Sequence, residues 1–587
     1  MAGKVAELEF LMTRENKAIA IAEMFSDLDN QRQEALAEIK DIRDFVCATD
    51  TTKTSNKKLP WKNSTTVPKL TQIRDNLHAN YMAALFPNDN WLKWEGNSFE
   101  DDSQEKAEAI EGYMSNKLRE SNFITTVSQL VYDYIDTGNA FADVEFVSES
   151  VEDPITGEVI PGYIGPRAVR TSIYDIVFNP ASTSFVNSPK ITRYVKSFGE
   201  LKADAETMPE KQYYLEALKK AEKVRSAAVN GHYSAEDFEK ASAFSIDGFG
   251  SLQSYYQSPY CELLEFEGDL YDAEKGELLR NYTITVLDRS YVIREQQIPS
   301  WLGKGSKCHV GWRLRPDNLY AMGPLANLVG MQYRIDHLEN LKADVFDLIA
   351  FPPLKIRGEV EPFEFAPRTE IFLDDPESDV EMLVPDTTAL NADLQIDILE
   401  NRMEEFAGAP KQAMGIRTPG EKTAHEVQTL ENAAGRIFQE KVRNFEINLL
   451  EPLLNAMLEV ARRNMDTADL VRVMDDDLGV SKFISITKED ITAKGKIRPV
   501  GARHFAARAQ LVQNLTGIFN SPIGQTIMPH LSSKALAKLV EDTLGLERFQ
   551  LFRDNVAVYE QAETQRALNT TQEDVEMNAI TPTEAPV

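Results

Sequence analysis

The stretch GPLANLVGMQYRIDHLENLKADVFDLIA, residues 323–350, decides the fold of this chain. Its apolar residues recur at helical spacing and predict one helix of about 26 residues, or about 39 Å at 1.5 Å per residue. The helix should end before Pro352 and Pro353, which cannot continue it. The predicted inner stripe consists of Leu325, Leu328, Gln332, Ile335, Leu338, Val345 and Leu348.

After this helix the chain is predicted to turn back on itself. Residues 351–388 carry a net charge of −7 and hold two strand candidates, LKIRGEV (354–360) and TEIFLDD (369–375). A second helix returns from about Thr388 to Phe406, and the loop GAPKQAMGIRTPGE (408–421) follows. Two such helices form too narrow a unit to bury both faces, so packing against copies of themselves is the natural solution.

The longest predicted helix runs from about Lys422 to Met465, with a kink expected at Pro452. Its apolar stripe consists of Val427, Leu430, Ala434, Ile437, Phe445, Leu449 and Leu453. Beyond it we predict a short mixed region, helices at residues 500–519 and 533–568, and a disordered acidic tail over residues 569–587.

Upstream, the first 140 residues are predicted to be mostly helical. Residues 7–46 indicate an amphipathic helix or a pair of helices, with Leu28, Leu36, Ile39, Ile42 and Phe45 near one face. Residues 49–68 indicate an irregular link, and helices are predicted at residues 70–87 and over 104–138, up to Gly138.

From Asn139 the pattern changes to period two, which predicts a sheet with a helical insert around residues 199–225. In NYTITVLDRSYVIREQQ (281–297), Tyr282, Ile284 and Val286 should share one face. The fold class predicted from the whole pattern is α+β, mainly helical.

Length and composition restrict the classes of function that the chain can have. The chain has 587 residues and a mass of 66.1 kDa, which indicates several domains, and its 93 acidic and 63 basic residues leave a charge of −30. That charge argues against a protein that grips nucleic acid over its whole surface, although not against one that lets DNA pass. Cys47, Cys261 and Cys308 match no disulfide or metal spacing, so folding in a reducing interior is expected.

Neither a signal peptide nor a membrane span is predicted. The stretch MAGKVAELEFLMTREN (1–16) lacks a basic segment followed by an apolar run, and no run reaches the ~18 apolar residues that a membrane helix needs.

No catalytic, cofactor-binding or metal-binding group is predicted. The run GKGSKCH (303–309) lacks the glycine spacing of a phosphate-binding loop and is interpreted as a surface turn. The histidines are scattered singly, which favours structural roles over metal binding. They are His78, His232, His309, His337, His425, His504 and His530.

Acidic clusters are the best enzyme-like signal, because two-metal nucleases need converging carboxylates. Asp475, Asp476 and Asp477 are consecutive, so their side chains diverge, and solvated turns are the favoured interpretation. The same interpretation covers Asp374, Asp375 and Asp379. The basic run at residues 494–508 is better explained as an interface or a helix end than as a nucleic-acid contact.

At this point the residues resemble a known family. The order of several stretches is similar to that of portal proteins, the head-to-tail connectors of tailed bacteriophages, and most similar to the short-tailed phage type. The matching stretches are WKNSTTVPKLTQIRDNLHANYMAALFP (61–87), VYDYIDTGNAFADVEF (131–146), SIYDIVFNPASTSF (172–185), MGPLANLVGMQYRIDHLENLKADVFDLIAFPPL (322–354) and GEKTAHEVQTLENAAGRIFQEKVRNFEINLLEPLL (420–454). Residues 200–260 and those past Asp466 match poorly.

The resemblance implies a portal fold with wing, stem, clip and crown regions. It divides the chain into N-terminal helices and an α+β wing (1–322), a stem helix (323–350), a clip (351–387), a returning stem helix (388–407), a tunnel loop (408–421), the long wing helix with the remaining wing (422–499), crown-like helices (500–568) and the tail (569–587).

The resemblance also implies a function without catalysis. Twelve copies would form a ring at one capsid vertex of the virion, after assembly in the host cytoplasm, and double-stranded DNA would pass through it during packaging and ejection. The partners implied are the packaging ATPase (large terminase), the major capsid and scaffolding proteins, and tail adaptor proteins.

Two groups of site residues follow. Lys411, Gln412 and Arg417 would face the DNA channel from the tunnel loop, unless Lys411 and Arg417 merely pair with neighbouring carboxylates. Glu359, Glu361, Asp374 and Asp375 would form the docking surface of the clip. The alternatives are a metal-dependent phage nuclease or packaging-motor subunit, and a helical scaffold or adaptor protein.

Overall fold

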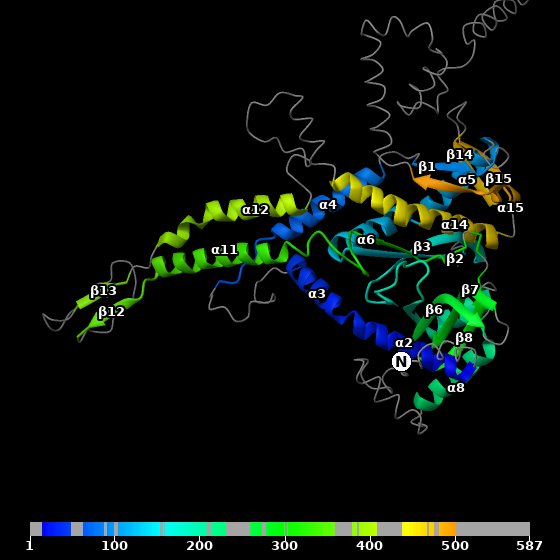
Figure 1. The fold of residues 1–587 in the computed structure, drawn as a ribbon, viewed down its shortest axis with the longest axis horizontal. Helices are drawn as coiled ribbons and strands as arrows, with labels where there is room; N and C mark the ends of the chain where they lie inside the picture. The colour runs from blue at the N-terminus through cyan, green and yellow to red at the C-terminus, as the bar shows by residue number, and fades with distance from the viewer. Residues whose placement is uncertain are drawn as a thin grey trace, which may run out of the picture.

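The structure, a computed structural model, contains both helices and sheets and confirms the α+β class (Figure 1). It describes residues 14–47, 63–86, 91–98, 104–152, 157, 159–207, 213–229, 259–272, 277–298, 300–301, 303–358, 379–383, 387–407, 437–465, 469–474 and 481–499. The predicted helices at 500–519 and 533–568 and the predicted tail at 569–587 lie outside these residues.

The elements follow one another in this order. The helices are α2 (Arg14–Gln31), α3 (Gln33–Cys47), α4 (Lys69–Leu85), α5 (Gln104–Glu120), α6 (Phe123–Asp136), α7 (Phe198–Thr207), α8 (Leu215–Val229), α11 (Val329–Ala350), η3 (Thr387–Ala392), α12 (Asp393–Ala407), η4 (Glu446–Leu450), α14 (Glu451–Asn464) and α15 (Lys488–Ile491). The strands are β1 (Leu92–Gly96), β2 (Asn139–Glu152), β3 (Val159–Thr171), β4 (Ile176–Phe178), β5 (Lys190–Ser197), β6 (Tyr260–Asp272), β7 (Glu277–Leu287), β8 (Tyr291–Gln297), β9 (Cys308–Gly311), β10 (Arg313–Arg315), β11 (Asn318–Met322), β12 (Leu354–Arg357), β13 (Asp379–Met382), β14 (Asp469–Met474), β15 (Ser481–Ile486) and β16 (Gly495–Pro499).

Two sheets form the middle of the chain. One is five-stranded and antiparallel in the order β4-β5-β6-β7-β8, and the other is three-stranded in the order β3-β2-β9. On β7, Ile284 and Val286 are completely buried against α2 and Tyr282 is partly buried, so the predicted shared face is confirmed. The opposite face of this sheet carries polar side chains.

The amphipathic segment before residue 47 is a pair of helices, α2 and α3. They meet at Arg32, whose buried guanidinium donates hydrogen bonds to Asp29 and to the backbone carbonyls of Ile173, Tyr174 and Ile176. Phe25 and Leu28 pack on the five-stranded sheet, whereas Ile42 and Phe45 join the main core.

The helical prediction over residues 104–138 is confirmed, and the stretch forms two helices, α5 and α6, with a break at Asn122. Asn122 has a φ of 53°, in the left-handed region that asparagine tolerates better than most residues. The break lets α6 bury Phe123, Val127 and Leu130 completely or nearly so in the main core.

The helix predicted from residue 323 begins only at Val329 and has 22 residues. Residues 324–328 form turns in which Leu325 and Leu328 are completely buried. Leu348, predicted on the inner stripe, is instead 41 % exposed, because the outer half of α11 leaves the body of the protein.

Gly138 and Gly323, which mark two changes of pattern in the sequence, are in contact. Gly138 has a φ of +75°, and a Cβ added there would lie 2.3 Å from the backbone N of Gly323. A Cβ on Gly323 would lie 2.8 Å from the carbonyl O of Ile135. Neither position has room for a side chain.

Gly138→Ala should therefore lower the free energy of unfolding by about 2 kcal/mol, from the strain of a positive φ and from the clash. Gly303→Ala is the matched control, since Gly303 has a φ of +68° but a Cβ there meets nothing within 4 Å. Urea denaturation followed by circular dichroism should show a larger loss for Gly138→Ala. Equal losses would contradict the backbone contact.

The long helix is described from residue 437 onward. Instead of a simple kink at Pro452, the backbone forms the π-helical turn η4, which ends two residues before the proline. Such a turn rearranges the backbone bonds that a proline cannot make. Phe445, Leu449 and Leu453 are completely buried as predicted, whereas Ile437 is 59 % exposed, which corrects its place on the stripe.

Segments distant in sequence join at the end of the described chain. Strand β1 pairs with β16 in antiparallel register, with Trp94 opposite Ile497. Strands β14 and β15 form a hairpin in the region predicted to be mixed.

Candidate functional site

A helical arm projects from the body of the protein (Figure 1). It consists of α11, which runs outward, the hairpin β12–β13 at its far end, and η3 with α12, which return alongside α11. At the root, Leu338 of α11 and Ile396 and Met403 of α12 are buried in the main core cluster. The stem helices at 323–350 and 388–407 and the clip at 351–387 were predicted over this region.

An extended segment, residues 63–67, is held on α11 by a row of polar side chains. We call Gln332, Asp336, Asn340 and Asp344 the polar ladder. The oxygens of its side chains accept hydrogen bonds from the backbone N–H groups of Leu70 (3.0 Å), Val67 (3.0 Å), Thr65 (2.9 Å) and Asn63 (3.0 Å), in that order. The Asn340 amide also donates to the Thr65 carbonyl at 2.9 Å.

The hydrogen bonds of the polar ladder form in a regular row because the spacing of residues along α11 matches that along the extended segment. Residues four apart on a helix are separated by about 6.0 Å along its axis, and alternate residues of an extended chain by about 6.6 Å. Asp344, Asn340 and Asp336 therefore meet the alternate N–H groups of Asn63, Thr65 and Val67, and Gln332 continues the row to Leu70 in the first turn of α4. The spacing Gln-x3-Asp-x3-Asn-x3-Asp is visible in the sequence, but only Gln332 was placed on the inner stripe and residues 49–68 were interpreted as an irregular link.

The same stretch of chain anchors the second helix of the arm. Lys69, at the start of α4, is buried and forms an ion pair with Glu404 of α12 at 2.7 Å and with Glu400 at 3.5 Å. Residues 63–70 thus fix the roots of both arm helices to the body.

Asp336 is the residue of the polar ladder whose buried carboxylate has one oxygen without a hydrogen-bond partner. It is completely buried, its Oδ1 accepts from Val67 and Gln332, and its Oδ2 has no hydrogen-bond partner. Burial raises the pKa of Asp336 to about 6, against the opposing effect of those two hydrogen bonds. A raised acid pKa means that the carboxyl stabilises the fold most below about pH 4 and that this contribution is lost as the pH rises through 6.

Asp336→Asn should therefore raise the free energy of unfolding at pH 7.5 by about 1 kcal/mol, because it removes a buried charge and keeps the acceptor oxygen. The gain should disappear at pH 4 in thermal melts. Asp344→Asn, at the more exposed end of the ladder, is the control and should give no comparable gain. A gain for Asp336→Asn that did not depend on pH would contradict the assignment.

The arm exposes apolar side chains on both helices and on the hairpin. Of the 24 large apolar residues that are exposed among the described residues, eleven lie on the arm. They are Leu341, Phe346, Leu348, Ile349, Phe351, Ile356, Met382, Leu383, Leu394, Ile398 and Phe406. Apolar surface concentrated in this way on a narrow projection is typical of a protein–protein interface.

The arm is also acidic. Helices α11 and α12 together hold nine Asp and Glu against three Lys and Arg residues. One exposed pair, Lys355 with Glu381 at 2.9 Å, links the two strands of the hairpin. Strand β12 was predicted as LKIRGEV, but its partner is Asp379–Met382, while TEIFLDD lies outside the described residues.

The residues predicted to form functional sites lie outside the described residues. Lys411, Gln412 and Arg417 belong to the chain between α12 and residue 437. Glu359, Glu361, Asp374 and Asp375 belong to the chain between β12 and β13, and Asp475, Asp476 and Asp477 follow β14. Their assignments stay predictions, whereas Asp379 is described and exposed on β13.

The run GKGSKCH is not a surface turn throughout, which corrects that interpretation. Lys307 is buried, and its Nζ lies 2.6 Å from Glu265, 3.1 Å from Glu267 and 3.4 Å from Asp143. Although burial alone would lower it, these carboxylates raise the pKa of Lys307 well above its ordinary value. A Cβ at Gly305 would lie 1.7 Å from the Glu267 carboxylate, so the glycine makes room for this cluster.

The described histidines and cysteines have structural surroundings. His78 stacks on Tyr132 at 3.7 Å, and His309 stacks on Phe141 and contacts Asn139 through Nε2 at 3.1 Å. Burial lowers the pKa of His309 to about 3. All three cysteines are free thiols.

Two kinds of feature are absent from the described part of the chain. It contains no group of three or more His, Cys, Asp or Glu side chains placed to hold a metal ion. Within that same part, no helix is both long enough and apolar enough to cross a membrane.

No family model matches the chain, and no curated protein matches it either.

Proposed function

We propose that this protein is a portal subunit, one of a ring of copies at a single capsid vertex through which viral DNA is packaged and ejected. The observation that carries the proposal is the arm, which exposes apolar side chains on two antiparallel helices and on the hairpin at its end. The order of the sequence stretches that resemble portal proteins supports the same function.

The position of this apolar surface supports a ring. One copy of the arm leaves Phe346 of α11 and Leu394 of α12 exposed, at 52 % and 73 %. Contacts between unlike faces of neighbouring copies form a closed ring when the rotation closes. In a ring, the α11 face of one arm would cover the α12 face of the next.

The charge of the arm suits a channel for DNA. A bore rich in cations would hold phosphates and slow DNA passage, whereas acidic arm helices would let the duplex slide. Lys411 and Arg417 would supply the few cations that contact it, and Gln412 would lie between them. The remaining partners in this proposal are the packaging ATPase and then tail adaptors at the hairpin, and the major capsid and scaffolding proteins around the ring.

Negative-stain microscopy and mass photometry of the purified chain test the proposal. Twelve chains of 66.1 kDa would give a ring of about 793 kDa with a central hole. A protein that stays monomeric under all assembly conditions would contradict it. The same sample should cut no DNA with magnesium, and magnesium-dependent cleavage lost on replacing Asp475, Asp476 and Asp477 by Ala would favour a nuclease instead.

A further inference from the structure

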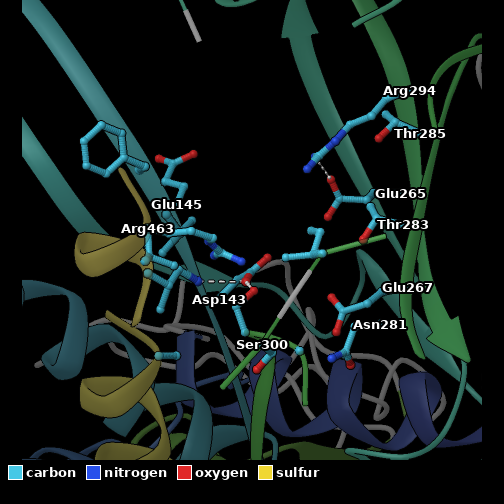
Figure 2. A pocket seen from close by; sticks show the side chains of 18 of the residues that line it. Asp143, Glu145, Glu265, Glu267, Asn281, Thr283, Thr285, Arg294, Ser300 and Arg463 are labelled. Atoms are coloured by element: carbon cyan, nitrogen blue, oxygen red, sulfur yellow. Dashed lines mark hydrogen bonds and ion pairs between the residues drawn. The ribbon is translucent and has the colours of Figure 1, made fainter. Parts of the chain in front are cut away.

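A cavity of about 330 Å³ lies between the polar face of the five-stranded sheet, strand β2 and helix α14. Figure 2 shows Thr283, Thr285 and Arg294 on the sheet side and Glu145 and Arg463 across from them. The volume lies at the lower end of the range typical of small-molecule sites. The proposed portal function does not use this cavity.

The polar wall follows from the period-two pattern of two strands. On β7, Asn281, Thr283 and Thr285 line the cavity while the residues between them pack under α2. On β6, Glu265 and Glu267 line it in the same way. The sequence therefore builds one apolar and one polar face into the same sheet.

Two buried side chains in this wall each have one polar atom without a hydrogen-bond partner. Thr285 is 2 % exposed and its Oγ1 makes no hydrogen bond. Arg294 is 7 % exposed and its Nε makes no hydrogen bond, although its Nη1 lies 3.5 Å from Glu265. Buried polar atoms are nearly always hydrogen-bonded, and because these two residues line a cavity, a molecule bound there can supply the missing partners.

The charged side chains around the cavity limit the kinds of molecule that can bind there. Lys307 contacts Asp143, Glu265 and Glu267, and Arg294 also faces Glu265, so the charges on this wall are largely compensated. An anion near Arg294 would also approach Glu265. A compact cation would leave the Arg294 Nε donor without an acceptor. A metal ion has no ligand set among the described residues.

We propose that the cavity binds a neutral polyhydroxylated small molecule, of the size of a monosaccharide or cyclitol. A hydroxyl group both donates and accepts, so it can accept from Arg294 Nε, exchange hydrogen bonds with Thr285 and donate to the carboxylate of Glu145. Neither an ammonium group, which only donates, nor a carboxylate, which only accepts, can do all three.

Saturation-transfer NMR on the full chain tests the proposal with D-glucose and myo-inositol as probes, and with putrescine, acetate and serine for the other charge classes. We expect transfer to at least one of the two polyols, and a dissociation constant about fivefold higher in Thr285→Val. Thr192→Val is the matched control: Thr192 is also completely buried with an unpartnered hydroxyl, but it does not line the cavity. It should leave the affinity unchanged.

Three results would overturn the proposal: no transfer to either polyol, transfer that Thr285→Val leaves unchanged, or transfer only to a charged probe. If Thr285→Val does not fold, Thr283→Val serves as the second variant on the same wall, with the same expectation. Because none of these readouts involves assembly, their failure leaves the portal proposal untouched.

Discussion

Replacing Lys307 by Met is expected to lower the free energy of unfolding by about 3–5 kcal/mol, the usual cost of removing one partner from a buried ion cluster. The side chain is 2 % exposed, and its ammonium lies within 3.4 Å of three carboxylates from two different sheets. Without it, Asp143, Glu265 and Glu267 would repel one another in a buried site, and the two sheets would lose their shared ion pair.

The loss of stability in Lys307→Met should also depend on pH. The carboxylates left behind in Lys307→Met should bind protons more readily in the folded state than in the unfolded state. The deficit measured by urea denaturation should therefore be smaller at pH 5 than at pH 7.5. Lys304→Met is the control, since Lys304 is an exposed lysine three residues away. Equal stability of Lys307→Met and Lys304→Met would contradict the role of the cluster.

Replacing Phe346 and Leu394 together by Gln is expected to abolish the proposed ring assembly while leaving the fold of the single chain intact. Burial of a large apolar side chain contributes about 1.5–3 kcal/mol, and each contact between neighbouring arms would lose two of them. Gln keeps good helix propensity, so α11 and α12 should remain. Mass photometry at micromolar concentration should show monomers.

The control for the arm variant uses two apolar residues of the body with similar exposure. Ile124 and Leu278 are 55 % and 51 % exposed, and their replacement by Gln should leave assembly unaffected. Circular dichroism should be the same for both double variants. Full rings from the arm variant would show that its apolar surface does not mediate assembly.

Local periodicity predicted much of this fold. Apolar spacing was sufficient to place α3 and α4, and alternation was sufficient to place β7. In each case the residues of the buried face lie within one short stretch of sequence. Boundaries were less accurate where tertiary contacts decide them. Asn122 separates two helices by its left-handed backbone, and the turn that follows Gly323, which lies against Gly138, puts the start of the next helix at Val329.

Pairings between distant segments could not be predicted in the same way. The polar ladder requires residues 63–67 to lie along α11, and no feature of residues 63–67 alone indicates that position. Lys307 was interpreted as part of a surface turn because its partners, Asp143, Glu265 and Glu267, are 40 or more residues away in the sequence. The side chains predicted for the DNA channel and the clip lie outside the described residues.

The contact between Gly138 and Gly323 closes a long excursion of the chain. The chain leaves this point at the end of α6 and returns to it just before the arm, after it has formed both sheets of the middle region. Because the two ends of the excursion touch, the start of the arm lies directly against the end of α6, in addition to its attachment through residues 63–70. The arm is therefore joined to the body at two places that are far apart in the sequence.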